Sequence, residues 1–180
     1  MLHIKIPERE LFDEKRQEFI TIKGESLQLE HSLVSLSKWE STWCKPFLGK
    51  DKKTDEETID YIRCMTINQN ASSKVFEYLP GSVYEQITNY INAPMTATWF
   101  NDRQTAKPSS ETITSEIIYY WMIVQNIPME CQKWHLNRLL TLIRVCNIKN
   151  QPAKKMGRNE MLANRKALNE ARKAKFNTKG

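Results

Sequence analysis

The 180-residue sequence predicts a mainly α fold: a helical body with a small N-terminal antiparallel β element and a basic C-terminal helix or tail. Through most of the chain, apolar residues recur at steps of three and four, the period of an amphipathic helix. Only near the N-terminus do they alternate at period two, and the chain has just 5 glycines. We expect residues 1–30 to form the β element, 31–149 the helical body and 150–180 the tail.

Three short apolar runs near the N-terminus predict strands. Residues 2–6 (LHIKI) alternate between apolar and polar side chains, and similar runs follow at 19–22 and 27–29. The charged segment 13–17 separates the first two runs. A β element of this size is too small to be a domain alone. We therefore expect it to cap the helical body or to offer an edge to a partner.

The period becomes helical after His31. Between Ser32 and Cys44 the apolar side chains fall three or four residues apart. His31 or Ser32 is suited to cap the first turn of this helix. Pro46 is expected to end it, because a proline disfavours helical backbone at the residue before it.

Two further helices are predicted from capping boxes, in which a hydroxyl side chain and a Glu three residues later satisfy each other's backbone N–H groups. Thr54 and Glu57 form the first box, and Ser82 and Glu85 form the second. Pro94 is expected to stop the second of these helices.

The segment before the next helix is less regular. Residues 95–100 (MTATWF) suit a strand, a helical turn or a packed loop, and residues 101–110 are polar and predict an exposed loop. Ser109 or Ser110 is expected to cap the helix that follows.

Residues 117–148 hold the densest apolar pattern in the chain and predict two helices joined by a bend at 126–128. Pro128 suits the first position of the second helix, where its missing N–H group is not needed. We expect the rest of the fold to pack on this hairpin. The second helix has one wide apolar face, formed by Trp134, Leu136, Leu139, Leu140, Leu142, Ile143 and Cys146.

The formal charge of +6 is unevenly distributed. Residues 149–180 hold ten of the 27 Lys and Arg residues and two of the 21 Asp and Glu residues, which gives this segment +8 and leaves −2 for the rest. The segment is a candidate contact for nucleic acid or an acidic partner. A solvated tail or a protein-binding helix fits as well, since no aromatic residues are interleaved for base stacking. The candidate contacts are Lys154, Lys155, Arg158, Arg165, Lys166, Arg172, Lys173 and Lys175.

The sequence predicts neither an enzyme nor a metal or cofactor site. It contains no glycine-rich phosphate-binding motif and no arrangement typical of a nucleophile triad. Cys131 and His135 are four residues apart, which would place both on one helix face, but no second ligand pair accompanies them. The cysteine spacing predicts free thiols in a reducing cytoplasm. No apolar run reaches about 18 residues, so we expect no membrane span.

Aromatic residues at helical spacing have two interpretations. Trp39, Trp43, Tyr119, Tyr120, Trp121 and Trp134 lie among Leu and Ile residues, as in an aromatic core. Alternatively, some of them line an exposed apolar groove for a partner helix, since Trp and Tyr are common anchors of such interfaces. On the second interpretation, the predicted partner-binding residues are Trp39, Trp43, Trp121, Trp134, His135 and Arg138.

A family resemblance rests on seven runs: residues 29–40 (LEHSLVSLSKWE), 45–48 (KPFL), 95–100 (MTATWF), 117–122 (IIYYWM), 127–147, 167–169 (ALN) and 178–180 (TKG). These runs resemble the tail assembly chaperones of long-tailed, siphovirus-type bacteriophages. The resemblance covers nearly the whole chain.

This resemblance implies a protein that binds the long tape-measure protein, keeps it soluble and promotes the assembly of tail-tube proteins around it. It implies a site of action in the host bacterial cytoplasm during virion assembly, and it is compatible with a homo-oligomer. A small helical protein with an apolar groove could cover a long helical partner in this way.

Two alternatives remain open. The first is a structural virion component, such as a connector, neck or tail-terminator subunit, whose N-terminal strands pair with neighbouring subunits in a ring. The second is a nucleic-acid-binding factor that acts through the basic tail.

Overall fold

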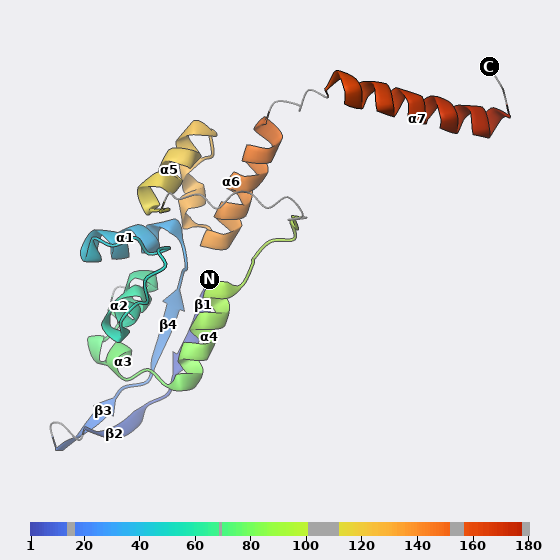
Figure 1. Cartoon of the computed structure of the whole chain (residues 1–180). Coiled ribbons are helices and arrows are strands. Elements are labelled where there is room, and N and C mark those ends of the chain that lie inside the picture. Colours follow the sequence, from blue (N-terminus) through green and yellow to red (C-terminus); the bar gives the residue numbers. More distant parts are fainter. Residues whose placement is uncertain (14–16, 69, 101–111, 152–156, 178–180) are drawn as a thin grey trace. The chain divides into compact units, whose positions relative to one another are not determined.

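The structure, a computed structural model, describes residues 1–13, 17–68, 70–100, 112–151 and 157–177. It confirms the broader part of the predicted fold class: the chain is mainly α with a small antiparallel β element (Figure 1). The chain divides into two compact units, Met1–Asn147 and Ile148–Gly180. None of the described helices is both long and apolar enough to span a membrane.

Four strands form two antiparallel pairs in the first unit. β1 (Leu2–Ile6) pairs with β4 (Glu25–Leu29), and β2 (Arg9–Asp13) pairs with β3 (Glu18–Ile22). The strand β2 was missed by the sequence prediction. Its outward positions carry both charged and aromatic side chains, so the period-two pattern is broken although Leu11 still lies opposite Ile20.

A kink separates the two pairs. Pro7 and Glu8 join β1 to β2, opposite Lys23 and Gly24 between β3 and β4. A Cβ on Gly24 would lie 3.1 Å from the Glu8 backbone nitrogen, so only glycine fits this close approach without a shift. The β1–β4 pair packs its alternating Ile and Leu side chains into the core. The far end of the β2–β3 pair carries Phe12 and Phe19 in mutual contact.

Both of the first two capping predictions are confirmed. α1 (Leu33–Trp43) begins after Ser32, whose hydroxyl accepts from the backbone of Ser35 in a capping box. It ends at Cys44, in a left-handed conformation, two residues before Pro46. α2 (Asp55–Met65) begins after Thr54, and the predicted box with Glu57 is present.

The third capping prediction is wrong. After α3 (Ser73–Glu77), α4 (Gly81–Asn92) begins one residue before Ser82, and Pro80 is its N-cap without a side-chain hydrogen bond. The Pro80 carbonyl accepts from the third and fourth residues after it, so the first turn closes through the backbone alone. α4 ends two residues before Pro94, as expected. Residues 95–100 form no regular element.

α5 (Ser115–Val124) does not use the serine caps predicted for it. Its N-cap is Thr114, which makes no side-chain capping bond. Ser109 and Ser110 lie outside the described residues, as does the loop predicted at 101–110. The Ser115 N–H group instead donates to Glu40, a residue 75 positions earlier. A distant carboxylate therefore takes the role expected of a local hydroxyl.

The second helix of the predicted hairpin begins later than expected. Residues Met129–Lys133 form a 3-10 helix, η1, whose N-cap is Pro128, and α6 (Leu136–Asn150) starts only afterwards. The break follows from tertiary contacts, because Ser32 and His135 form a β-bridge and the Leu136 N–H group donates to the His31 carbonyl. Pro128 is thus not the first residue of an α-helix.

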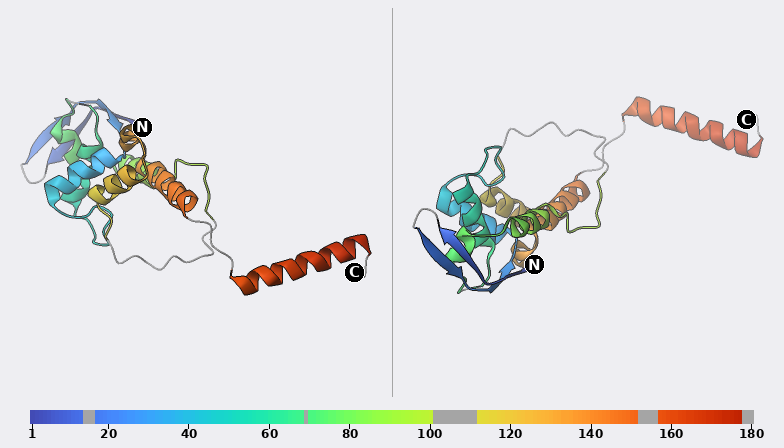
Figure 2. Two further views of the ribbon diagram at one scale, coloured as in Figure 1. Left: turned by 90° about the horizontal axis from the view of Figure 1, so that it is seen from above. Right: turned by 90° about the horizontal axis from the view of Figure 1, so that it is seen from below.

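Two hydrophobic clusters meet at α1, which contacts α2 on one side and α5 with η1 on another (Figures 1 and 2). Trp39 belongs to the cluster formed with the strands, α2, α3 and α4. Leu33 and Leu36 belong to the cluster formed with α5, η1 and α6. Phe47, in the loop after α1, packs against both clusters. α1 therefore contributes residues to both clusters and lies between them.

The buried carboxylate of Glu40, on α1, links this helix to its neighbours. One oxygen accepts from the Phe47 N–H group at 2.7 Å, and the other accepts from the Ser115 N–H group at 2.7 Å. The second bond also places negative charge at the N-terminus of α5, where the helix dipole favours it. Hydrogen bonds to a charged group contribute about 1.5–3 kcal/mol each.

The second unit contains α7 (Arg158–Phe176), which begins after Gly157 and ends at Asn177 in a left-handed conformation. Wherever its side chains are described, they are exposed. α7 therefore has no buried face within the described residues.

Glu40→Gln is expected to destabilise the body by about 2–3 kcal/mol, because the amide nitrogen would oppose one of two buried N–H groups. Urea unfolding at neutral pH measures this change. Glu85→Gln, at an exposed position on α4, serves as the control and should change the free energy of unfolding by less than about 0.5 kcal/mol. Equal effects of the two substitutions would contradict the role given to Glu40.

Candidate partner-binding surface

α5 carries apolar side chains around most of its circumference but buries only one side. Ser115, Ile118 and Met122 face the core, at helical steps of three and four. Tyr120, Ile123 and Val124 lie on the opposite side and are 62%, 65% and 58% exposed. A helix that is apolar all round is normally buried all round. These three residues, the α5 patch, are therefore an apolar surface without a partner in the described part of the chain.

The helix that carries the α5 patch is held by contacts with η1 and α6. The Tyr119 hydroxyl donates to the Gln132 side chain on η1 at 2.9 Å, and the Gln125 amide donates to Asn147 on α6 at 2.6 Å. Ile118 and Met122 are completely buried beneath the patch. The backbone that carries the exposed side chains is thus fixed by a packed core and two polar contacts, which limits the backbone entropy that a partner must remove on binding.

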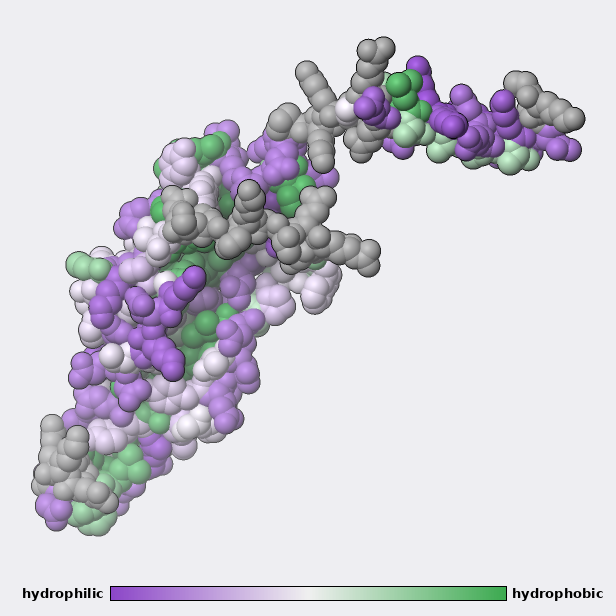
Figure 3. Space-filling view, viewed as in Figure 1, coloured by the Kyte–Doolittle hydropathy of each residue, from purple (hydrophilic) through white to green (hydrophobic). Residues whose placement is uncertain are grey.

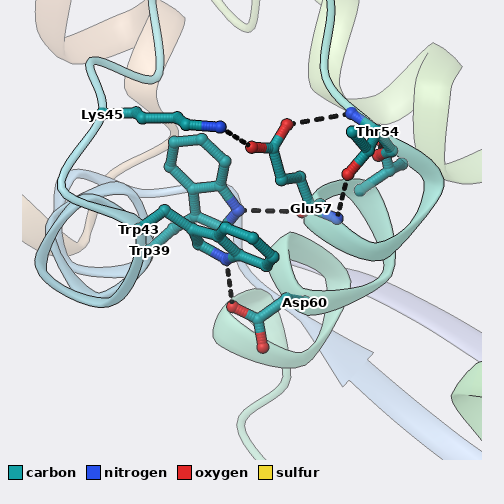
Figure 4. Close-up of polar contacts among 7 residues, drawn as sticks. Trp39, Trp43, Lys45, Thr54, Glu57 and Asp60 are labelled. Atoms are coloured by element: carbon teal, nitrogen blue, oxygen red, sulfur yellow. Dashed lines mark hydrogen bonds and ion pairs between the residues drawn. The ribbon is translucent and has the colours of Figure 1, made fainter.

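Two of the predicted partner-binding residues instead join α1 to α2 (Figure 4). Trp39 is 1% exposed, and its indole N–H donates to the Glu57 carbonyl at 2.8 Å. Trp43 is half-buried, stacks on Trp39 and donates to the Asp60 carboxylate at 2.9 Å. Trp39 is therefore a core residue and cannot contact a partner, which corrects its place in the predicted surface.

The Glu57 carboxylate makes further polar contacts at this α1–α2 joint, the junction between the two helices. It accepts from the Lys45 ammonium at 2.5 Å and from the Thr54 backbone N–H group at 2.9 Å (Figure 4). These two bonds, with the Lys45 bond the stronger influence, hold the pKa of Glu57 below its usual range. The polar groups around Trp39 are satisfied within the body and leave no open site.

The other predicted residues are divided between surface and core. Arg138 is exposed and stacks its guanidinium 4.1 Å above the half-buried Trp134 ring. Trp121 is half-buried at one side of the α5 patch. His135 is half-buried, with Nε2 2.9 Å from the Tyr90 carbonyl oxygen. Only some of the predicted set therefore presents area to a partner.

Cys131 and His135 do not share the face of one α-helix, which corrects the geometry assumed for them. Cys131 is buried in η1, and His135 precedes α6. Within the described residues no group of three or more His, Cys, Asp or Glu side chains is placed to hold a metal ion.

The predicted basic contacts lie in the second unit. Arg165, Lys166, Arg172, Lys173 and Lys175 are exposed along α7. Lys154 and Lys155 lie outside the described residues, and α7 begins at Arg158, whose side chain is not described.

Ile123 and Val124 were not among the residues predicted for the surface. A usable signal was present, because residues 117–124 are almost uninterrupted apolar residues in a short helix. One buried face takes up about three or four residues of such a segment. The remainder must either contact another element or stay exposed, and only the tertiary structure distinguishes these outcomes.

A pair of histidines lies where the two hydrophobic clusters meet. The His31 and His135 rings are 5.0 Å apart, and His31 Nδ1 lies 2.6 Å from the Tyr61 hydroxyl. Burial, with a smaller effect of His135, lowers the pKa of His31 to about 4. Burial also lowers the pKa of His135, against the opposing effect of its bond to the Tyr90 carbonyl. Both rings are therefore neutral at pH 7.

The body is expected to lose stability in mild acid. An unfolded chain binds a proton at His31 below about pH 6.5, whereas the folded protein does so only near pH 4. Stability should fall through this window by at most about 3 kcal/mol, because each pH unit costs about 1.4 kcal/mol. Urea unfolding at several pH values measures this slope.

His31→Asn should flatten the slope, whatever its effect on absolute stability, since it removes the titrating group. His3→Gln changes an exposed histidine on β1 and should leave the slope as it is. An unchanged slope in His31→Asn would show that His31 is not the responsible group.

Comparison with known proteins adds no assignment to this geometry: no protein-family model, no curated protein and no solved structure matches the chain.

Proposed function

We propose that this chain is a non-enzymatic tail assembly chaperone of a long-tailed bacteriophage, which binds the tape-measure protein in the host cytoplasm. The observation that carries the proposal is the α5 patch, a row of exposed apolar side chains on a well-supported helix. The resemblance of residues 29–40, 95–100, 117–122 and 127–147 to this family supplies the identity of the partner.

The chemistry of the α5 patch suits a helical partner. Ile123 and Val124 lie three and four residues after Tyr120, so the three side chains are neighbours on one side of a single turn of α5. A tape-measure protein is long and helical, and its apolar face would pack side by side with these side chains. Because these side chains are 62%, 65% and 58% exposed, burying the rest of each contributes about 1–2 kcal/mol. Together they can supply much of the energy of a micromolar complex.

The family resemblance covers much of the body and one residue of the α5 patch. Runs 29–40 and 127–147 include residues of the cluster that α1 forms with α5, η1 and α6, such as Leu33, Leu36 and Leu139. Run 117–122 includes Tyr120, which is part of the patch. We assign the α5 patch to the tape-measure protein. Tail-tube proteins and further copies of the chain are the other partners that we propose for this protein.

Co-expression with the tape-measure protein of the same phage tests the proposal. The soluble fraction of that protein should rise when this chain is present. Ile123→Lys with Val124→Lys should abolish the rise, because charges cannot be buried in the apolar contact and affinity should fall by about 100-fold or more. Thr88→Lys with Asn89→Lys adds the same charge to exposed positions on α4 and should have no effect. A tape-measure protein that is equally soluble without this chain would rule the proposal out.

A structural role in the virion is the second candidate, and the end of the β2–β3 pair favours it. Phe12 and Phe19 are 48% and 75% exposed there, with ring centroids 5.1 Å apart. Exposed strand edges next to an apolar pair can extend the sheet of a neighbouring subunit in a connector, neck or terminator ring.

Mass spectrometry of purified particles separates the two candidates. An assembly chaperone should be absent from the finished virion, whereas a ring subunit should be present in a fixed copy number. If the chain is found in particles, Phe12→Ser with Phe19→Ser should reduce its incorporation, since both substitutions remove apolar contact area.

A further inference from the structure

The proposed chaperone role makes no use of α7, which has a charge and a surface unlike those of the body. Residues 148–180 carry +8, whereas residues 1–147 carry −2. The described side chains of α7 are exposed along its whole length. In Figure 3 its surface is mostly hydrophilic, with paler apolar residues along one side. A strongly cationic helix of this kind is complementary to a polyanion.

The helical register aligns the cations. Arg165 and Arg172 are seven residues apart, as are Lys166 and Lys173, and seven residues make almost two helical turns. Each pair therefore lies along one side of α7 with a separation of about 10 Å. These four residues form the basic face of α7. Glu170 lies at the edge of this face, while alanines occupy much of the opposite side.

The basic face also contains apolar and amide side chains. Leu162, Asn169 and Phe176 follow the same seven-residue spacing and line a shallow surface groove together with the arginines and lysines. Met161 and Leu168 fall beside the arginines in the helical register. The mixture of arginine, asparagine and apolar groups matches the edges of base pairs in a major groove, which offer acceptors, donors and the thymine methyl group.

The same register argues against a membrane surface. An interfacial helix needs an apolar face free of charge, with its lysines at the borders. On α7 the arginines Arg165 and Arg172 fall between Met161 and Leu162, in the middle of the only side with large apolar residues. That side could enter a bilayer only by burying two guanidinium groups.

We propose that α7 binds double-stranded DNA, with its basic face in the major groove and its lysines on the phosphates. A B-form major groove about 12 Å wide admits an α-helix. The major groove of duplex RNA is too narrow and deep for side chains to read. This proposal is independent of the chaperone proposal, because it uses a different unit of the chain.

Fluorescence anisotropy of the full-length chain with a labelled 20-base-pair DNA duplex tests the proposal. The association constant should fall steeply between 50 and 200 mM salt, and the variant Arg165→Gln, Lys166→Gln, Arg172→Gln, Lys173→Gln should bind at least about tenfold more weakly at 100 mM salt. Its slope of log K against log salt should be shallower by about 2, at about 0.9 for each of the two lysine contacts with phosphate that are lost. Glutamine is a good helix former, so α7 should persist in this variant.

The matched control is Lys5→Gln, Lys23→Gln, Lys50→Gln, Lys52→Gln, which removes the same charge from exposed positions of the body. It should retain the DNA affinity within about twofold, because these lysines do not belong to the basic face. Equal losses in the two variants would overturn the proposal. So would binding of duplex RNA, of polyglutamate or of phosphatidylserine vesicles as tightly as duplex DNA, or the absence of DNA binding at 50 mM salt. The soluble yield of co-expressed tape-measure protein should be the same for both variants.

Discussion

The buried carboxylate of Glu40 is the constraint on which the body depends. It accepts one hydrogen bond from the loop after α1 and one from the first residue of α5, so it ties together segments that lie far apart in the sequence. Two such bonds to a charge are together worth about 3–6 kcal/mol. A typical domain is stable by only about 5–15 kcal/mol. The start of α5, and hence the position of the apolar surface on it, follows from this one side chain.

The sharing of α1 between two hydrophobic clusters decides which surfaces remain for a partner. Leu33 and Leu36 face one cluster and Trp39 faces the other, so little of this helix is left exposed. The α1–α2 joint also satisfies the polar atoms of both its tryptophans, within the Glu57 and Asp60 network. Trp39 and Trp43, two of the predicted interface anchors, are thus engaged in contacts within the body. The α5 patch stays exposed because α5 packs with α1, η1 and α6 on one side only.

The two units of the chain are stabilised in different ways. The body buries a sizeable core and carries almost balanced charge, so its structure is determined by packing. α7 buries none of its described side chains and carries much of the chain's positive charge, so its stability must come from propensity and from whatever it binds. In proteins most helical stability comes from the packing of one face, and α7 has no packed face within its described residues. Binding to a polyanion would relieve its charge repulsion and favour the helical state.

Local signals in the sequence determined the fold class and several of its boundaries. The capping groups of Ser32 and Thr54 lie within three residues of the N–H groups that they satisfy, so the starts of α1 and α2 could be predicted without any tertiary contact. The strand at Leu2–Ile6 followed from its alternation in the same way.

The tertiary structure alone decided the starts of α5 and α6, the burial of Trp39 and the exposure of Ile123 and Val124. Each depends on a group distant in sequence: the Glu40 carboxylate for α5, the His31 carbonyl for α6 and the Glu57 carbonyl for the Trp39 indole. Apolar periodicity shows that a helix has a face to bury, but not whether a second element exists to cover its other side. For α5 the described chain covers one side, through α1, η1 and α6, and leaves Tyr120, Ile123 and Val124 exposed, so this apolar surface could not be located from the sequence.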